Sequence, residues 1–307
     1  MRIVSFLPSA TETLYELGAG SQIVGVTHEC NFPSQAKKKP RVIRPSFNPG
    51  QMTGREVDNK IVELMHSGKD IYIVDEKTLK RVSPDLIVAQ GLCEVCSPFT
   101  KEVNRAVSLL RSRPDVLVLD PHDLDDILVS MMDVAERIGK IKEGRKLVAS
   151  LQKRIDIVRS MKVKSSSSRR PKVLCVEWID PLFTAGHWVP QMVEYAGGIS
   201  GVGSVGEPSR RMDIDEAAQL DPDIIVLMPC GFDIKRTLKE LPALARNEKW
   251  KSLQAVKSRN VYAVNANAYF SKPGPRTVVG LEILAKILHP KASQHIRVPK
   301  SSYKKIY

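Results

Sequence analysis

Short runs of apolar residues alternate along the chain with stretches in which apolar residues recur every three or four positions. The runs have the length of buried strands, and the periodic stretches fit amphipathic helices. This alternation is typical of α/β proteins with largely parallel sheets. The expected strands are Ile3–Phe6, Ile23–Thr27, Ile71–Val74, Leu86–Ala89, Val116–Leu119, Lys172–Val176, Ile224–Met228 and Val261–Val264. The expected helices are Thr11–Leu17, Glu56–His66, Lys101–Leu110, Pro190–Tyr195, Asp213–Gln219, Lys235–Ala245 and Arg276–Leu288.

The middle of the chain has a different pattern. From residue 123 to about residue 162 there is no proline, there are only two glycines, and apolar residues keep a helical spacing throughout. The pattern predicts one extended helix, or two helices with a break near Gly139 to Gly144. A single helix of this length, rising about 1.5 Å per residue, would join two lobes as a strut. A polar joint, Ser165–Pro171, follows it.

A short internal repeat supports two similar lobes. The segment Val82–Val88 matches Leu220–Val226, about half the chain later, and each copy contains a Pro-Asp turn before an apolar run. The pattern predicts a helix end, a turn and a buried strand in both places. We therefore expect an N-terminal lobe over residues 1–122, a connecting helix over 123–164 and a C-terminal lobe over 165–307.

Composition narrows the range of partners. Of the 307 residues, 42% are hydrophobic and 26% are charged, which is ordinary for a globular protein. The net charge of +13 would suit a nucleic acid or an anionic surface, but Lys and Arg are spread along the chain and only residues 291–307 are locally rich in them. We therefore expect a basic, solvated surface and no nucleic-acid partner.

The start of the sequence reads as part of the fold. Met1-Arg2 leads directly into the first expected strand, without the features of a secretory signal, and no stretch has the roughly 18 apolar residues of a membrane span. We expect a cytoplasmic protein, or an extracytoplasmic one if the N-terminus was trimmed. In the cytoplasm the five cysteines would be reduced thiols or metal ligands rather than disulfides.

Unusual side chains gather in the segments that follow the expected strands. In parallel α/β sheets, ligands bind beyond the carboxyl ends of the strands, so these segments predict the site. They hold four of the five cysteines, two of the six histidines and two of the three tryptophans. We expect the lobes to share one cleft lined by thiols, imidazoles and aromatic rings.

The sharpest local motif is Cys93-x-x-Cys96. Such a pair chelates zinc or an iron–sulfur cluster when further ligands converge on it, or serves as a redox couple. It also fits small, semi-buried thiols that pack the walls of a cleft, since cysteine is commonly buried. The candidate metal ligands are His28, Cys30, Cys93, Cys96 and Cys230, with His187 as a further one.

Polar and aromatic residues of the same loops are candidates for direct ligand contacts. Ser9 and Glu12 have the spacing of a helix capping box, and the amides of this turn also fit an anionic ligand group. Aromatic residues here either pack in the core or stack on a flat ligand. No nucleophile triad, P-loop or dinucleotide fingerprint is present in the sequence, so we expect no catalytic residues. The ligand-binding candidates are Ser9, Thr11, Trp178, His187, Trp188, Arg210, Tyr269, Phe270 and Arg276.

Ordered blocks across nearly the whole chain resemble a known family. They are Ile3–Glu12, Val24–Cys30, Leu92–Cys96, Glu177–Pro181, Ala185–Pro190, Pro229–Phe232 and Pro273–Arg276. In these blocks the chain resembles the helical-backbone branch of the periplasmic-binding-protein superfamily, which binds cobalamin, haem and ferric siderophores, and most of all its cobalamin-binding subgroup. The resemblance implies an α/β fold of two Rossmann-like lobes with mostly parallel sheets, joined by one long α-helix, the class III substrate-binding-protein fold. It also implies a monomer, with aromatic ligand contacts at Phe47, Tyr269 and Phe270.

Three hypotheses for the function follow. The leading one is a non-catalytic binding protein that holds a cobalamin-like corrinoid or another metal chelate between its lobes, with an ABC transporter permease as partner if it serves import. The alternative is an intracellular metalloprotein or enzyme with a zinc or iron–sulfur site built from cysteines and histidines. The third is a scaffold that keeps the fold without a ligand.

Overall fold

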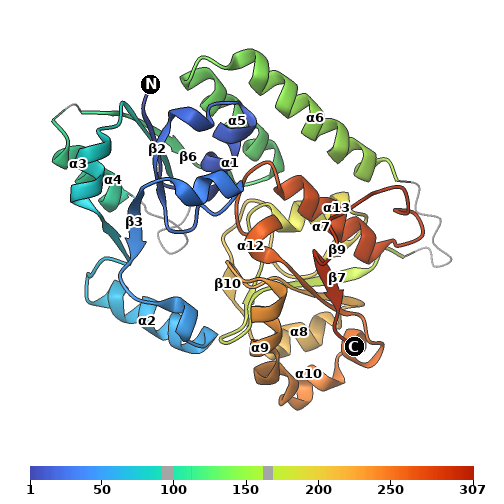
Figure 1. Ribbon diagram of the computed structural model, residues 1–307. Helices are drawn as coiled ribbons and strands as arrows, with labels where there is room; N and C mark the ends of the chain where they lie inside the picture. The colour runs from blue at the N-terminus through green and yellow to red at the C-terminus, as the bar shows by residue number, and fades with distance from the viewer. Residues whose placement is uncertain (92–99, 112, 162–168) are drawn as a thin grey trace. The chain divides into compact units, whose positions relative to one another are not determined.

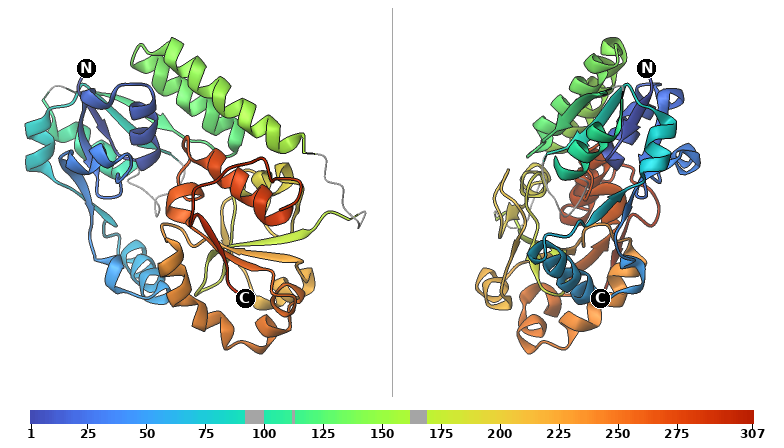
Figure 2. Two further views of the ribbon diagram at one scale, coloured as in Figure 1. Left: turned by 45° about the vertical axis from the view of Figure 1, so that its right-hand side comes forward. Right: turned by 90° about the vertical axis from the view of Figure 1, so that its left-hand side faces the viewer.

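The computed structural model describes residues 1–91, 100–111, 113–161 and 169–307. The chain forms two compact units, each with its own sheet and helices (Figures 1 and 2). Unit 1 contains Met1–Met52, Glu56–Pro121 and Asp125–Ser150, and unit 2 contains Thr53–Arg55, His122–Leu124 and Leu151–Tyr307. Within the described ranges, no helix combines the length and apolar character that crossing a membrane requires.

Unit 1 is built on a six-stranded sheet with the order β4-β3-β2-β1-β5-β6. All neighbouring strands are parallel except β3 and β4, which are antiparallel. The pattern did not predict β3, because only two of its five residues, Val42 and Ile43, are buried. The strands are β1 Ile3–Ser5, β2 Ile23–Thr27, β3 Arg41–Pro45, β4 Tyr72–Val74, β5 Leu86–Gln90 and β6 Asp115–Leu119.

Helices cover both faces of this sheet because side chains alternate along each strand. On β5, Leu86 and Val88 join a core cluster with residues of α1 and α5, whereas Ile87 and Ala89 join one with residues of α3 and α4. The helices from α1 to α6 are α1 Pro8–Glu16, α2 Gly54–His66, α3 Glu76–Val82, α4 Thr100–Leu109, α5 Leu124–Arg137 and α6 Ile141–Arg159, with short 3₁₀ turns at Gly20–Gln22, Ser34–Lys38 and Pro49–Gln51.

Unit 2 is built on a sheet with the order β10-β8-β7-β11-β12-β13, and β9 also pairs with β7. Its centre is the parallel set β7, β11 and β12, and short antiparallel strands extend both sides. The strands are β7 Lys172–Trp178, β8 Phe183–Thr184, β9 Ile199–Ser200, β10 Arg210–Arg211, β11 Ile224–Leu227, β12 Val261–Val264 and β13 Tyr303–Lys305.

The sheet of unit 2 is also packed on both faces. One face forms a core cluster in which Leu174 and Ile225 join Trp250. On the other, a Cβ on Gly198 would lie 2.7 Å from Leu288 and 3.0 Å from Val173, so glycine permits close packing there. The helices are α7 Val189–Tyr195, α8 Ile214–Leu220, α9 Ile234–Ala245, α10 Glu248–Ser252, α11 Gln254–Lys257, α12 Ala266–Tyr269 and α13 Thr277–Leu288.

The central helical pattern forms two helices, α5 and α6, which lie side by side in both figures. Gly139 between them has φ +70°, a left-handed conformation that glycine adopts without strain. A Cβ on Gly144 would collide with the Cβ of Ala135, so glycine lets α6 touch α5. The expectation of one unbroken helix over residues 123–164 is therefore wrong, and the alternative with a break is confirmed. One helix, α6, still contains residues of both units.

The repeated Pro-Asp segments occupy equivalent places in the two sheets. The Asp85 carboxylate accepts a hydrogen bond of 2.7 Å from the N–H of Arg2, and the Asp223 carboxylate accepts one of 2.7 Å from the N–H of Lys172. The N–H groups of the two aspartates donate back to the carbonyls of Arg2 and Lys172, at 2.8 and 2.9 Å. Each aspartate therefore joins two parallel strands, β1 to β5 or β7 to β11, at their amino ends.

The basic side chains at the start of β1 and β7 have matching roles as well. The Arg2 guanidinium donates to the carbonyl of Val82 at 2.7 Å, and the Lys172 ammonium donates to that of Leu220 at 3.2 Å. These carbonyls end α3 and α8, where a cation is favoured by the helix dipole. The repeat that predicted two similar lobes thus corresponds to one shared arrangement of strand, helix end and aspartate.

Replacing Asp223 with Ala should lower the free energy of unfolding of unit 2 by about 1.5–3 kcal/mol, because a charged acceptor leaves the N–H of Lys172. The carboxylate also pairs with Arg169 at 2.7 Å. All three tryptophans belong to unit 2, so their fluorescence during urea denaturation reports its unfolding. Glu248→Ala, which removes an exposed pair with Lys251, is the control and should cost less than about 0.5 kcal/mol. Equal stability of the two variants would contradict the role of Asp223.

Candidate ligand-binding site

The parallel strands of unit 2 end together, and the loops that follow them are joined by hydrogen bonds. The N–H of Cys230 donates to the carbonyl of Glu177 at 3.0 Å, which joins the loop after β11 to the end of β7. The N–H of Asn267 donates to the carbonyl of Phe232 at 3.0 Å, which joins α12, after β12, to the same loop. We call this region the carboxyl-edge surface, and define it as Glu177–Asp180, Cys230–Phe232 and Asn267–Tyr269, with the adjoining Arg236 and Arg276.

Two aromatic rings and a guanidinium stack on the carboxyl-edge surface. The ring centroids of Trp178 and Phe232 lie 5.0 Å apart with 54° between their planes. The guanidinium of Arg236, near the start of α9, lies 4.8 Å from the centroid of Phe232. Both contacts are attractive, through the ring quadrupoles and the cation over a ring face. All three side chains are half-buried, so each keeps part of its surface in solvent.

The arginines beside this stack have carboxylate partners. Arg236 pairs with Glu240, one turn along α9, at 3.1 Å. The Nε of Arg55 donates to the carboxylate of Asp180 at 2.9 Å. The indole N–H of Trp178 donates to the carbonyl of Asp180 at 3.2 Å, which holds the ring in place. The two arginines beside the stack, Arg236 and Arg55, are thus each paired with a carboxylate.

The structure divides the predicted aromatic contacts into two kinds. Trp188 and Phe270 are 5% and 3% exposed, and the Trp188 indole N–H donates to the Phe270 carbonyl at 2.9 Å. Tyr269 is half-buried, with the Arg276 guanidinium 5.8 Å from its ring centroid. Trp178, Tyr269 and Arg276 therefore belong to the carboxyl-edge surface, whereas Trp188 and Phe270 support it from the core.

Cys230 is half-buried on the same surface, and His187 lies in the loop between β8 and α7 with its ring stacked on Trp188 at 5.7 Å. Sequence reasoning missed Phe232 and Arg236. Phe232 follows Cys230 in a strand-end loop, so the rule that selected the cysteine also applies to it. Arg236 lies on a helix, where an arginine gives no distinct signal.

Arg210 lies on β10, at the opposite end of the sheet order from β13, and pairs with Glu216 at 2.7 Å. The hydrogen bond from Arg210, together with one from the N–H of Asp213, holds the pKa of the Glu216 carboxyl below its ordinary value. Asp213 and Glu216 also form a capping box at the start of α8. Arg210 thus has a local partner that accounts for its position without a ligand.

Ser9 and Thr11 are buried inside α1 of unit 1. The helix begins at Pro8 with Leu7 as N-cap, and no side chain caps it. The capping box predicted at Ser9 and Glu12 is therefore wrong. Pro8 is the physical reason, because its fixed φ and missing N–H suit the first helical position and move Ser9 into the helix.

Cys30 is a fully buried thiol in the core of unit 1. The hydroxyls of Thr11 and Thr27 lie 3.1 and 3.3 Å from its sulfur. Arg41 supports this loop by donating to the carbonyls of Thr27 and Cys30, the latter at 3.0 Å. These contacts favour the interpretation of Cys30 as a packing group. Nearby, the rings of His28 and Tyr72 lie 6.0 Å apart.

The predicted metal site depends on residues in several places. Cys93 and Cys96 lie outside the described residues. Among the residues that the structure does describe, no group of three His, Cys, Asp or Glu side chains is placed to hold a metal ion. His28 and Cys30 belong to unit 1 and Cys230 to unit 2. The metal site therefore stays a prediction.

Phe47, the remaining predicted aromatic contact, is half-buried in the segment after β3.

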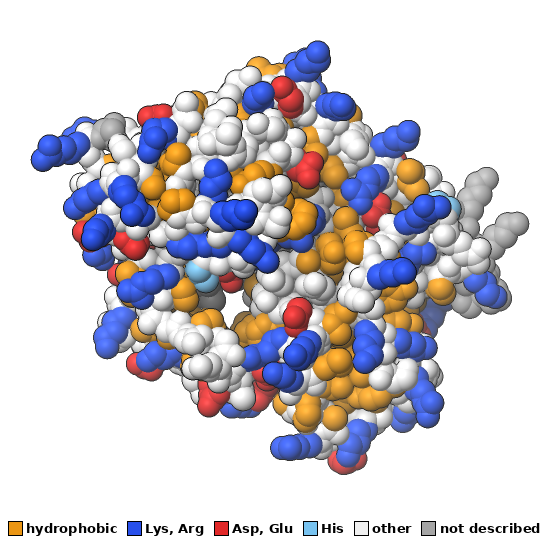
Figure 3. All heavy atoms as spheres, viewed as in Figure 1, with side chains coloured by type: hydrophobic (Ala, Val, Ile, Leu, Met, Phe, Trp, Pro, Cys, Tyr) orange, Lys and Arg blue, Asp and Glu red, His pale blue; other side chains and the backbone are white. Residues whose placement is uncertain are grey.

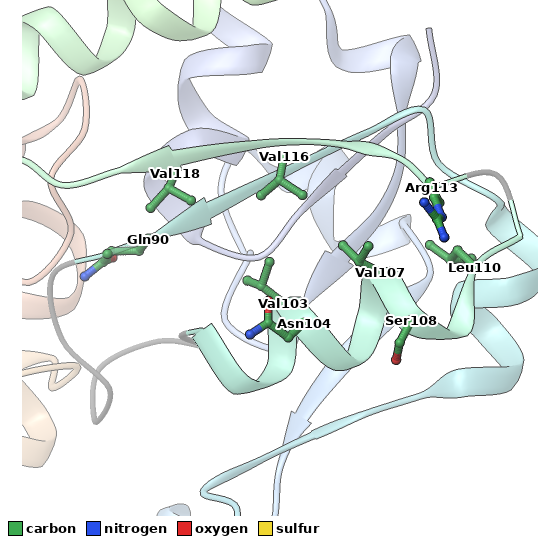
Figure 4. A pocket seen from close by; sticks show the side chains of 10 residues that line it. Gln90, Val103, Asn104, Val107, Ser108, Leu110, Arg113, Val116 and Val118 are labelled. Atoms are coloured by element: carbon green, nitrogen blue, oxygen red, sulfur yellow. The ribbon is translucent and has the colours of Figure 1, made fainter.

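Unit 1 also has a hollow of about 780 Å³ between α4 and the strands β5 and β6 (Figure 4). Its walls are mainly apolar, and Val118 on β6 is 55% exposed. Among the described residues that line it, none is a predicted ligand contact and none carries an aromatic ring. The lining residues are Gln90, Gly91, Val103, Asn104, Val107, Ser108, Leu110, Arg113, Val116 and Val118.

The basic residues do not gather into one patch on the face in Figure 3, where Lys and Arg side chains are spread over the surface. Lys and Arg are therefore spread over this face of the molecule, as they are along most of the sequence.

The described cysteines should differ in reactivity. Burial, and to a smaller extent the charge of Glu177, raises the pKa of the Cys175 thiol to about 12. Because the thiolate is the nucleophile, Cys175 should resist iodoacetamide in the folded protein at pH 8, whereas the half-buried Cys230 should react. Peptide mapping by mass spectrometry before and after unfolding in urea distinguishes them. Equal labelling of both in the folded protein would contradict the burial of Cys175.

Two α/β units, and an aromatic surface where the parallel strands of one unit end, define a protein built to bind a ligand. The chain belongs to the family described as periplasmic binding protein, whose profile matches residues 3–268. Membership confirms the resemblance seen in the sequence. It also confirms the expectation of a non-catalytic binding protein rather than an enzyme.

Relatives cover most of the chain at low identity. YvrC, an ABC transporter substrate-binding lipoprotein of Bacillus subtilis, is 25% identical over 294 residues, which are 94% of this chain and 80% of the relative. A vitamin B12-binding protein of Vibrio cholerae is 23% identical over 285 residues, 92% of this chain and 86% of its own. The periplasmic haem-binding protein RhuT of Roseiflexus sp. RS-1 superposes with a TM-score of 0.68 at 21% identity, covering 95% and 99% of the two chains. This superposition confirms the predicted fold.

The cytoplasmic location expected from the sequence is contradicted. The family is one of periplasmic proteins, and the relatives include a lipoprotein and a periplasmic protein, which points to an extracytoplasmic location. The expectation rested on the first residues of the sequence alone, whereas the family match covers residues 3–268. The expectation of reduced cysteines depended on the cytoplasm and loses its basis as well. The alternative hypothesis, an intracellular metalloprotein, loses the basis for its intracellular setting in the same way.

Proposed function

We propose that this protein binds a cobalamin-like corrinoid on the carboxyl-edge surface of unit 2, as the substrate-binding component of an ABC transporter. The relatives support this choice of ligand class, since one is a vitamin B12-binding protein, one a haem-binding protein and one an ABC transporter substrate-binding lipoprotein. Cobalamin and haem are both metal chelates with a broad, flat ring. Aromatic side chains held at a fixed position offer such a ring a surface on which to stack.

The observation that carries the proposal is the pairing of Trp178 with Phe232, whose centroids are 5.0 Å apart. Trp178 ends β7 and Phe232 lies in the loop after β11, so the folded sheet sets their spacing before any ligand arrives. The hydrogen bond from the Trp178 indole to the carbonyl of Asp180 removes the rotational freedom of the larger ring. Binding to a preorganised surface loses less side-chain entropy, which favours affinity.

The charges beside the stack favour a corrinoid over haem. A corrinoid ring is edged by neutral carboxamides, whereas haem carries propionate groups that need cations. Arg236 and Arg55 are already paired with Glu240 and Asp180. A propionate placed there would meet carboxylates as well as guanidinium groups, and like charges disfavour the wrong partner. Carboxamides make hydrogen bonds without this repulsion.

Isothermal titration of cyanocobalamin into the protein tests the proposal. Trp178→Ala and Phe232→Ala should each weaken binding by roughly tenfold to a hundredfold, as expected for an aromatic group at the centre of an interface. Thermal melting of each variant without ligand checks that the fold is retained. A parallel titration with haem should give weaker binding than the corrinoid.

Tyr307→Ala is the matched control for these variants. Tyr307 is 41% exposed and follows β13, whose Lys305 pairs with Tyr262 near the start of β12. It therefore lies at the opposite edge of the sheet, and its loss should leave the affinity unchanged. Binding of haem without binding of cobalamin would contradict the choice of ligand. Unchanged cobalamin affinity in Trp178→Ala would contradict its placement.

A further inference from the structure

The hollow of unit 1 is walled by aliphatic side chains from one helix and one strand. Val103, Val107 and Leu110 recur at helical spacing along one face of α4, and Val116 and Val118 lie two residues apart on one face of β6. The valines of the two rows point toward each other across the hollow (Figure 4). Side chains in such rows normally close a core without large voids, but here they border a hollow of about 780 Å³.

The floor of the hollow belongs to the core of unit 1, and its rim reaches solvent. Val103 and Leu110 are buried in the core cluster that also contains Ile87 of β5. Val118 lies on the last strand in the order of the sheet and is 55% exposed. A ligand in the hollow would therefore contact side chains that the core already fixes, and would remove the apolar surface of Val118 from water. Removal of apolar surface from water is the main driving force for the binding of apolar groups.

The chemistry of the lining indicates what kind of ligand fits. Among the described residues that line the hollow, none is aromatic and Arg113 is the only charged one. Arg113 is exposed and lies at one end of the hollow beside Leu110, and Gln90 lies at the other end (Figure 4). A flat ring would find no aromatic side chain to stack on, whereas a flexible alkyl chain can lie along the aliphatic rows. The single guanidinium at one end favours an anionic group at one end of that chain.

We propose that the hollow of unit 1 binds an unbranched acyl chain with an anionic head group, the chain between α4 and β6 and the head group beside Arg113. The volume of about 780 Å³ lies within the range of about 300–1,000 Å³ that is usual for small-ligand sites. An extracytoplasmic protein meets such chains in two forms, as free fatty acids and in the phospholipids of a membrane. All described lining residues belong to unit 1, so the proposal does not depend on the corrinoid site in unit 2.

Calorimetric titration of dodecanoate into the protein, below the concentration at which dodecanoate forms micelles, tests this site. A shorter chain covers less apolar surface, so the affinity should fall roughly tenfold from dodecanoate to decanoate and again from decanoate to octanoate. Val118→Asp places a carboxylate at the rim of the hollow and should weaken dodecanoate binding at least about tenfold. Because Val118 is 55% exposed, the fold should tolerate this change, and thermal melting of the variant checks it.

Val129→Asp is the matched control. Val129 is 58% exposed on α5 of the same unit and is not among the described residues that line the hollow. The same substitution there changes the net charge equally and should leave the affinity for dodecanoate unchanged. Arg113→Gln tests the head group separately. It should weaken decanoate binding roughly twofold to fivefold, as expected for an exposed charge pair, and leave the binding of uncharged decanol unchanged.

Sedimentation with vesicles of phosphatidylglycerol and phosphatidylcholine distinguishes the two sources of the acyl chain. Vesicle binding that is lost in Val118→Asp but kept in Val129→Asp would support the proposal with the membrane as the source. Dodecanoate binding without vesicle binding would support it with free fatty acids as the source. The proposal would be overturned if the parent does not bind dodecanoate, if the affinity does not change with chain length, or if Val118→Asp and Val129→Asp bind dodecanoate equally well.

Discussion

Two aspartate carboxylates fix the amino ends of the central strands, and the arrangement of each unit follows from them. Asp85 and Asp223 each accept a hydrogen bond from the N–H of the residue at or just before the start of the neighbouring parallel strand. When parallel strands are aligned at their amino ends, their carboxyl ends and the following loops also come side by side. In unit 2 this alignment brings the end of β7 within one hydrogen bond of Cys230. A repeat of a few residues in the sequence thus helps to determine where the strand-end loops lie.

Most of the fold could be predicted because its main elements have defined buried faces. β2 and β12 have the expected bounds, Ile23–Thr27 and Val261–Val264. Elements that are too short to show a repeating pattern of apolar residues could not be predicted. One is α11, which has four residues, and another is β3, whose two buried residues lie between arginines. The capping box at Ser9 failed because a neighbouring proline decides where that helix begins.

The candidate site could be predicted only in part, because residue type and loop position say little about burial. Trp178 and Cys30 were selected by the same rule, but Trp178 is half-buried at the end of β7, whereas Cys30 lies in the core beside threonine hydroxyls. Phe232 was missed because phenylalanine is an ordinary core residue, although its loop was identified. The hollow between α4 and β6 depends on tertiary packing, and no local pattern contains it.

The central claim is that the carboxyl-edge surface of unit 2 holds the ligand, and amide hydrogen–deuterium exchange with and without cobalamin tests it most directly. The account predicts slower exchange on binding in peptides that cover residues 177–182, 230–233 and 265–271. It predicts no change in α10 and α11, the second of which leads into the amino end of β12. Slower exchange confined to α10 and α11, or no change in the three loop peptides at saturating ligand, would contradict it.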